Sequence, residues 1–101
     1  MAGLRFSEAA RADIRAIYRQ GVEGFGVRQA DGYAAGLRQT IDRLVLLPES
    51  ARHRESMTRP VRILPFRSHV IIYAIDERGV HVLRVRHALE DWIDNPVGDH
   101  R

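Results

Sequence analysis

The side chains best suited to chemistry lie in one stretch near the C-terminus, RVRHALEDW at residues 84–92. Arg84 and Arg86 carry planar guanidinium groups, which pair well with phosphates and carboxylates. His87 follows them, and an imidazole can transfer protons near neutral pH. Three interpretations fit these residues: a surface for an anionic partner, a ribonuclease site, or an ordinary solvated strand end. A ribonuclease needs a general base beside its arginines, for which His87 and Glu55 are the candidates.

Basic charge is concentrated in the middle of the chain. All 16 basic residues are arginine. Residues 51–86 hold 8 arginines against 3 acidic residues, whereas residues 87–101 hold 1 arginine against 4 acidic residues. A basic middle followed by an acidic tail indicates an anionic partner surface.

Composition also bounds the classes of protein that are possible. A chain of 101 residues suits a single domain, 1–101, whose last residues, 95–101, are expected to fray. Cysteine is absent, which excludes disulfides and thiolate zinc sites. The histidines do not follow metal-ligand spacing, and no glycine-rich phosphate loop follows a strand, so we predict no metal and no cofactor. Without a long apolar run or a signal sequence, we expect a cytoplasmic protein.

Two helices are predicted in the N-terminal half, after a short strand at 4–6. Ser7 is a favourable N-cap, and the apolar residues that follow recur at helical spacing. The glycines at 21, 24 and 26 are expected to end this helix and form a short connection. A second helix is predicted from about 27 to 46, where Pro48 ends the apolar periodicity. Such a short connection predicts an antiparallel helix hairpin.

The C-terminal half changes to strand patterning. Residues 48–60 are polar and rich in arginine, which predicts a loop, and residues 61–63 alternate. The run HVIIYAI at 69–75 predicts a central strand covered on both faces, and a turn at 76–79 leads to a return strand at 80–87. The order β-α-α-β-β-β predicts an α+β fold of two layers, in which the helix hairpin packs on a small, mostly antiparallel sheet.

Side-chain alternation predicts what the final strand exposes. Leu83 and Val85 should face the helices. No further helix is available for the other face, which we expect to be partly open. That open face would hold these residues of the final strand: Val80, Val82, Arg84 and Arg86. Arg62 on a neighbouring strand and Arg67 in the next loop would extend an arginine-rich surface.

Four stretches, in order along the chain, resemble the ParE-type toxins of bacterial type II toxin–antitoxin systems, within the ParE/RelE superfamily. They are FSEAARADIRAIYRQ (6–20), FGVRQADGYAAGLRQTIDRLVLLPE (25–49), VRILPFRSHVIIYAID (61–76) and VLRVRHALEDW (82–92). The resemblance runs nearly end to end. It implies a single toxin domain with a helix hairpin against an antiparallel sheet, and a cognate antitoxin protein that wraps the toxin and neutralises it.

Members of this superfamily differ in their target. Resemblance to ParE implies inhibition of DNA gyrase, and therefore growth arrest and plasmid stabilisation, whereas RelE-like members cleave mRNA on the ribosome. Those nucleases usually place a tyrosine or a His–Tyr pair near the end of the last strand. In this sequence Ala88 and Leu89 follow His87, and no tyrosine lies beyond Tyr73. We therefore expect a gyrase inhibitor without catalytic residues. A ribosome-dependent endoribonuclease and a non-toxic relative that only binds its antitoxin remain alternatives.

The expected contacts with the target or the antitoxin come from the basic stretch and the end of the last strand. His87 and Asp91 are also expected to fix the strand end and the turn after it. The lone tryptophan either packs on the domain or meets a partner. The predicted partner-binding residues are Arg62, Arg67, Arg84, Arg86, His87 and Trp92.

Overall fold

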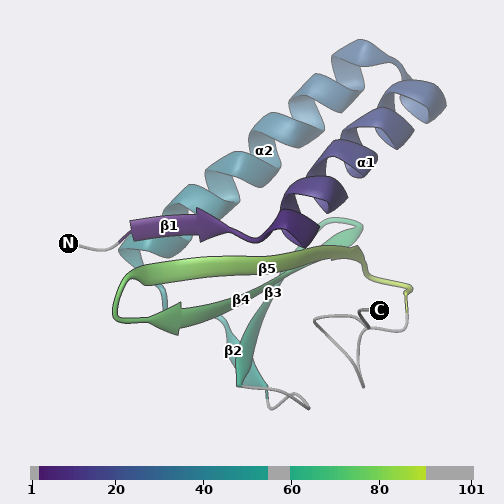
Figure 1. Ribbon diagram of the computed structural model, residues 1–101. Coiled ribbons are helices and arrows are strands. Elements are labelled where there is room, and N and C mark those ends of the chain that lie inside the picture. Colours follow the sequence, from purple (N-terminus) through teal and green to yellow (C-terminus); the bar gives the residue numbers. More distant parts are fainter. Residues whose placement is uncertain (1–2, 55–59, 91–101) are drawn as a thin grey trace.

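The computed structural model describes residues 3–54 and 60–90, which form a helix hairpin on a five-stranded sheet (Figure 1). The N-terminal elements are β1 (Gly3–Phe6), α1 (Glu8–Phe25) and α2 (Val27–Leu46). The remaining elements are β2 (Arg52–Arg54), β3 (Val61–Phe66), β4 (His69–Asp76) and β5 (Gly79–His87). The predicted two-layer α+β architecture is confirmed. Neither helix combines the length and apolarity that crossing a membrane requires.

The helix hairpin has a single interruption. Ser7 begins α1, because its hydroxyl oxygen accepts the Ala10 N–H at 2.9 Å. The helix then runs through Gly21 and ends only at Phe25, so the prediction that it stops at Gly21 was wrong. A glycine inside a helix costs only about 1 kcal/mol relative to alanine, which packing against a neighbouring helix outweighs. The break falls at Gly26, whose φ of 93° few other residues adopt, and α2 has its predicted bounds.

The sheet has the order β1-β5-β4-β3-β2, with β1 parallel to β5 and all other pairs antiparallel. The strand β2 lies inside the segment predicted as a loop, where it pairs with β3 at the sheet edge. Three polar residues carry too short a pattern to predict such a strand. At the other edge, a Cβ on Gly79 would lie 2.3 Å from the Gly3 backbone, so β1 docks only against a glycine.

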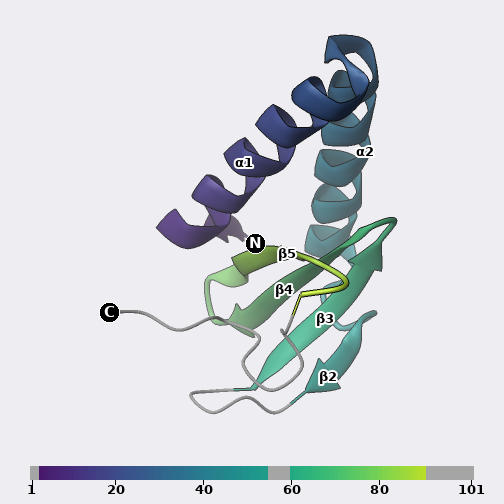
Figure 2. The ribbon, with the colours of Figure 1, turned by 90° about the vertical axis from the view of Figure 1, so that its right-hand side faces the viewer.

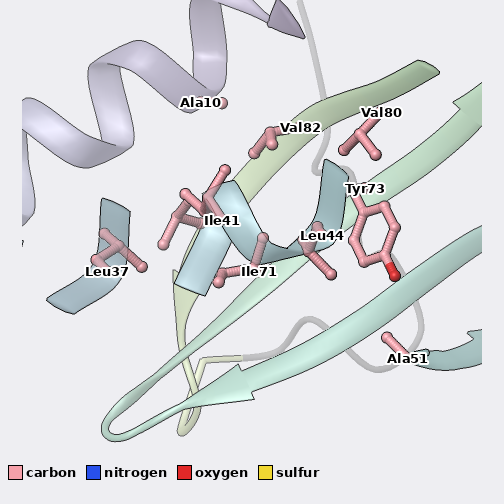
Figure 3. Close-up of a cluster of buried hydrophobic side chains, with 10 residues drawn as sticks. Ala10, Leu37, Ile41, Leu44, Ala51, Ile71, Tyr73, Val80 and Val82 are labelled. Atoms are coloured by element: carbon pink, nitrogen blue, oxygen red, sulfur yellow. The ribbon is translucent and has the colours of Figure 1, made fainter. Parts of the chain in front are cut away.

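The main core lies between α2 and the helix-facing side of the sheet (Figure 3). Leu37, Ile41 and Leu44 of α2 are buried at their predicted helical spacing. They pack in one cluster with Tyr73 of β4, which is 0% exposed. The Tyr73 hydroxyl donates a hydrogen bond to the Pro48 carbonyl at 2.6 Å, which ties the end of α2 to the sheet.

A β-bulge changes which side chains of β5 face the helices. Ile72 pairs with Arg84 whereas Tyr73 pairs with Val82, so Leu83 is an extra residue in the strand. Val80 and Val82 consequently join the helix-facing core, and Leu83 points to the opposite face. The prediction for these three residues was wrong, because one inserted residue shifts the alternation. Val85, beyond the bulge, faces the helices as predicted.

The face of the sheet away from the helices is not open as predicted. A second cluster of side chains from β3, β4 and β5 is buried there, and Ile72 at its centre is 0% exposed. Leu83, brought to this side by the bulge, adds to the cluster. No helix among residues 3–54 and 60–90 covers this face. Its members are Val61, Ile63, Val70, Ile72, Ala74 and Leu83.

Candidate functional site

A groove of about 430 Å³ lies between the helix hairpin and one end of the sheet. The two helices meet at their tip and spread apart toward the sheet (Figure 2). Ile14 and Ile17 of α1, with Ala34 and Leu37 of α2, give the groove apolar walls. At the sheet end the lining becomes polar, and this polar end consists of Tyr33, Arg67, Ser68, His69 and His87.

A tyrosine and two histidines are in contact at the polar end. The Tyr33 hydroxyl lies 2.6 Å from His69 Nδ1. His69 is opposite His87 in the β4–β5 register, and their rings lie 5.3 Å apart at an interplanar angle of 72°. Burial lowers the pKa of His69, and the nearby His87 lowers it further. Burial raises the pKa of Tyr33, which therefore keeps its proton. With His69 neutral, the hydroxyl donates to Nδ1 and the imidazole proton sits on Nε2.

His87 closes the turn that follows β5. Its main-chain N–H donates to Glu90 Oε1 at 2.7 Å, and its Nδ1 accepts the Leu89 N–H at 3.1 Å. These bonds match the predicted role of His87 in fixing the strand end. An Nδ1 that accepts a hydrogen bond places the proton of the neutral ring on Nε2.

Arg67 supplies the permanent positive charge at the polar end. It lies in the two-residue connection between β3 and β4, with a φ of 51° that is uncommon for a residue other than glycine. Its side chain is exposed, and the guanidinium carbon lies 5.5 Å from the centre of the Phe66 ring. This stacking holds the charge beside the groove.

Arg84, expected on an open face, instead forms an ion pair with Asp13 of α1. Its Nε lies 2.7 Å from Asp13 Oδ2, and its Nη2 lies 2.9 Å from Oδ1. Asp13 also accepts the Val85 N–H at 3.0 Å, and the two charged side chains are only 19% and 16% exposed. This contact exists because β1 pairs with β5 only as far as Val82, which leaves the edge of β5 beyond it to α1.

Comparison with known proteins decides the family. The family described as "ParE toxin of type II toxin-antitoxin system, parDE" matches residues 4–92. The chain belongs to the ParE toxin family. It is therefore a toxin of a type II toxin–antitoxin system, as the resemblance predicted. Toxin ParE1 of Caulobacter vibrioides is 32% identical over 83 residues, which cover 82% of this chain and 85% of that relative.

A solved structure shares the ParE fold. It is described as the chromosomal ParDE TA system from P. aeruginosa, and it matches with a TM-score of 0.75. The match covers 86% of this chain and 96% of the other, at 21% sequence identity. The helix hairpin on a small sheet is thus an arrangement that this ParE toxin shares with a chain of a ParDE system.

The ParE fold brings together only part of the predicted partner surface. Arg67 and His87 meet at the polar end of the groove. Arg86 Nη2 lies 3.5 Å from Glu90 and its side chain is only 14% exposed. Arg62 donates to the carbonyl of Ala51 at 2.9 Å and so holds the segment before β2. Three residues and one segment named in the sequence predictions lie outside the described residues: Glu55, Asp91, Trp92 and the tail 95–101.

Three residues of the ParE toxin site were not predicted from sequence. Tyr33 and His69 lie 36 positions apart, and no local pattern links them. Asp13 carried a signal, since it is an acidic residue directly before Ile14, a half-buried apolar residue of α1 that packs against the core. Among residues 3–54 and 60–90, no group of three acidic or histidine side chains is arranged to hold a metal ion.

Proposed function

We propose that this ParE toxin acts in the cytoplasm by binding and inhibiting DNA gyrase, and that a cognate antitoxin neutralises it. The choice of a protein target over RNA cleavage depends on one observation: the basic residues of β5 already form ion pairs within the fold. Arg84 is neutralised by both carboxylate oxygens of Asp13, and Arg86 faces Glu90. A ribonuclease needs such guanidinium groups to stabilise the charge of a pentacoordinate phosphate. These arginines are already paired within the fold, so action by protein binding is favoured over cleavage of RNA.

The groove supports the proposed contact with an antitoxin. Its apolar walls suit the apolar face of an amphipathic helix, a common mode of peptide recognition. Of the predicted contact residues, Arg67 and His87 lie where such a segment would reach the polar end. Arg62, Arg84 and Arg86 contribute instead by holding the fold. Trp92 stays a predicted contact.

A supercoiling assay with purified gyrase tests the proposed target. We expect micromolar toxin to inhibit supercoiling or to trap cleaved DNA, and equimolar antitoxin to restore the reaction. Toxin without effect at this concentration would remove gyrase as the target. The control variant is Arg11→Ala, which changes an exposed arginine of α1 that is not among the residues lining the groove.

Primer extension on translated mRNA tests the endoribonuclease alternative. The contact between Tyr33, His69 and His87 is the observation that keeps this alternative in view, because imidazoles can serve as acid and base. Discrete cuts that disappear in His87→Gln would replace the gyrase proposal. Intact transcripts during growth arrest would leave it in place. Unaffected growth after induction without antitoxin would favour a relative that only binds antitoxin.

A further inference from the structure

Each of the two histidines in the groove has one ring nitrogen engaged and one remaining. His69 Nδ1 is bonded to the Tyr33 hydroxyl at 2.6 Å, and His87 Nδ1 accepts the Leu89 N–H at 3.1 Å. Neither Nε2 has a hydrogen-bond partner among residues 3–54 and 60–90. With each Nδ1 engaged, the neutral form of either ring carries its proton on Nε2. The groove therefore has two N–H donors, 5.3 Å apart at the ring centres, without a described acceptor.

The charges around these donors favour an anion. Arg67 stands beside them, exposed and stacked on Phe66. No aspartate or glutamate is among the described residues that line the groove. Among the described residues, the acidic group that acts on His69 is Glu90, whose carboxylate already accepts the main-chain N–H of His87 and faces Arg86. Two imidazole donors and a guanidinium without a carboxylate in the lining make a site for a carboxylate.

We propose that the polar end of the groove is a carboxylate-binding subsite, in which His69, His87 and Arg67 receive one acidic side chain of the protein segment that fills the groove. This proposal rests on the proposed antitoxin partner and names the chemistry that the antitoxin must present. The apolar walls bind the apolar side chains of that segment, and the acidic side chain sets its register along the groove.

Binding at this subsite is coupled to proton uptake. A carboxylate beside His69 favours the imidazolium, which burial and His87 disfavour in the empty groove. When His69 is protonated, Nδ1 becomes a donor to the Tyr33 oxygen, and the hydroxyl proton turns to the Phe66 carbonyl at 3.5 Å. The contact thus survives protonation. The other ionisable groups around His69 are Glu90 after β5, Arg67 in the β3–β4 connection, and Tyr18 of α1, which is bonded to Asp31.

Histidine ring NMR of the purified toxin tests the subsite directly. We expect added acetate, at constant ionic strength against chloride, to shift the ring signals of His69 and His87 and to leave His81 unmoved. The variants His69→Gln and His87→Gln assign the signals. The control is His81→Gln, which lies on the same strand as His87. Acetate that moves neither groove signal would overturn the proposal. Signals that respond to inorganic phosphate but not to acetate would also overturn it, since the site would then hold a free oxyanion.

Antitoxin binding, measured at pH 6 and pH 8, tests the source of the carboxylate. We expect binding to be about tenfold tighter at pH 6, because each pKa unit by which the carboxylate raises a bound imidazole corresponds to a tenfold change in affinity. His87→Gln and Arg67→Gly should reduce this ratio, and His81→Gln should not. Tight binding with no pH dependence would contradict the subsite and leave the toxin–antitoxin proposal intact. Absent antitoxin binding would contradict the proposed function, while the acetate titration would still decide the subsite.

Discussion

Two cationic regions lie on either side of the end of β5, and they differ in what faces their arginines. On the α1 side, both oxygens of Asp13 meet the guanidinium of Arg84, and the pair is mostly shielded from water. On the α2 side, Arg67 is exposed against Phe66, near two histidines and no acidic groove residue. The same residue type joins a helix to a sheet in one place and stands available to a partner in the other. The position of a single carboxylate makes the difference.

Asp13→Ala should give the largest effect, because it removes the carboxylate that pairs with Arg84 within the fold. Arg84 loses two hydrogen bonds and Val85 N–H loses its acceptor. We expect the free energy of unfolding to fall by about 3 kcal/mol, as measured by urea titration. Asp42→Ala, which breaks the exposed Arg38 pair, is the control and should cost no more than about 0.5 kcal/mol. Equal losses would show that the α1–β5 ion pair has no special structural role.

Tyr33→Phe should give a smaller effect in the groove region. It removes the hydroxyl that contacts His69 Nδ1 and leaves the ring against Phe66. The expected loss in the free energy of unfolding is about 1 kcal/mol, typical of one hydrogen bond. Tyr18→Phe is the matched control, because it removes a hydroxyl bonded to Asp31 at an exposed position, where water replaces the bond. A larger loss from Tyr18→Phe would contradict the importance assigned to the Tyr33–His69 contact.

The groove region should also make stability depend on pH. The pKa of His69 lies below its ordinary value of 6.5 in the folded protein, mainly through burial. As pH falls below about 6.5, the unfolded chain therefore takes up this proton before the folded one, and the free energy of unfolding decreases. Urea titrations between pH 8 and pH 5 measure the slope. His69→Gln should flatten it, and an unchanged slope would assign the effect to other groups.

Local patterns in the sequence correctly predicted those features of the fold that depend on a single helix or strand. The apolar spacing of α2, from Leu37 to Leu44, predicted its bounds and its buried side. The β-branched run of β4 predicted a strand covered on both faces, and Ile71 and Ile72 are indeed buried on opposite sides. These properties follow from helical and strand periodicity, which each segment carries within itself.

Features that depend on two distant segments were not predictable in the same way. The bulge at Leu83 exchanges the faces of the first half of β5, and it is defined only by the pairing with β4. Arg84 is paired within the fold because α1 places Asp13 beside it, although the two residues are 71 positions apart in the sequence. The groove histidines meet only because β4 and β5 pair in one register. Sequence therefore predicted the basic character of this end of the molecule and not which of its charges are available.

The smallest effect should come from Asp76→Asn, which tests whether shielding distinguishes the Asp13–Arg84 pair from other ion pairs. Asp76 has a similar geometry, with Oδ2 at 2.7 Å and Oδ1 at 3.3 Å from the Arg5 guanidinium, but the two side chains are 42% and 26% exposed. Arg5 and the Arg78 N–H lower the pKa of Asp76 from 3.8 to about 2. Because the folded pKa is the lower one, this pair stabilises the fold above about pH 4, and the contribution disappears as pH falls toward 2.

At neutral pH, water and salt screen the Asp76–Arg5 pair. We therefore expect Asp76→Asn to lower the free energy of unfolding only slightly, and we expect this decrease to be smaller still in high salt. The loss caused by Asp13→Ala should persist in high salt, because α1 keeps solvent ions from that pair. Urea titrations of both variants at low and high sodium chloride make this comparison. If high salt reduced both losses equally, shielding by α1 would not explain why Arg84 is paired within the fold. The short distance between Arg84 and the carboxylate would then be the explanation.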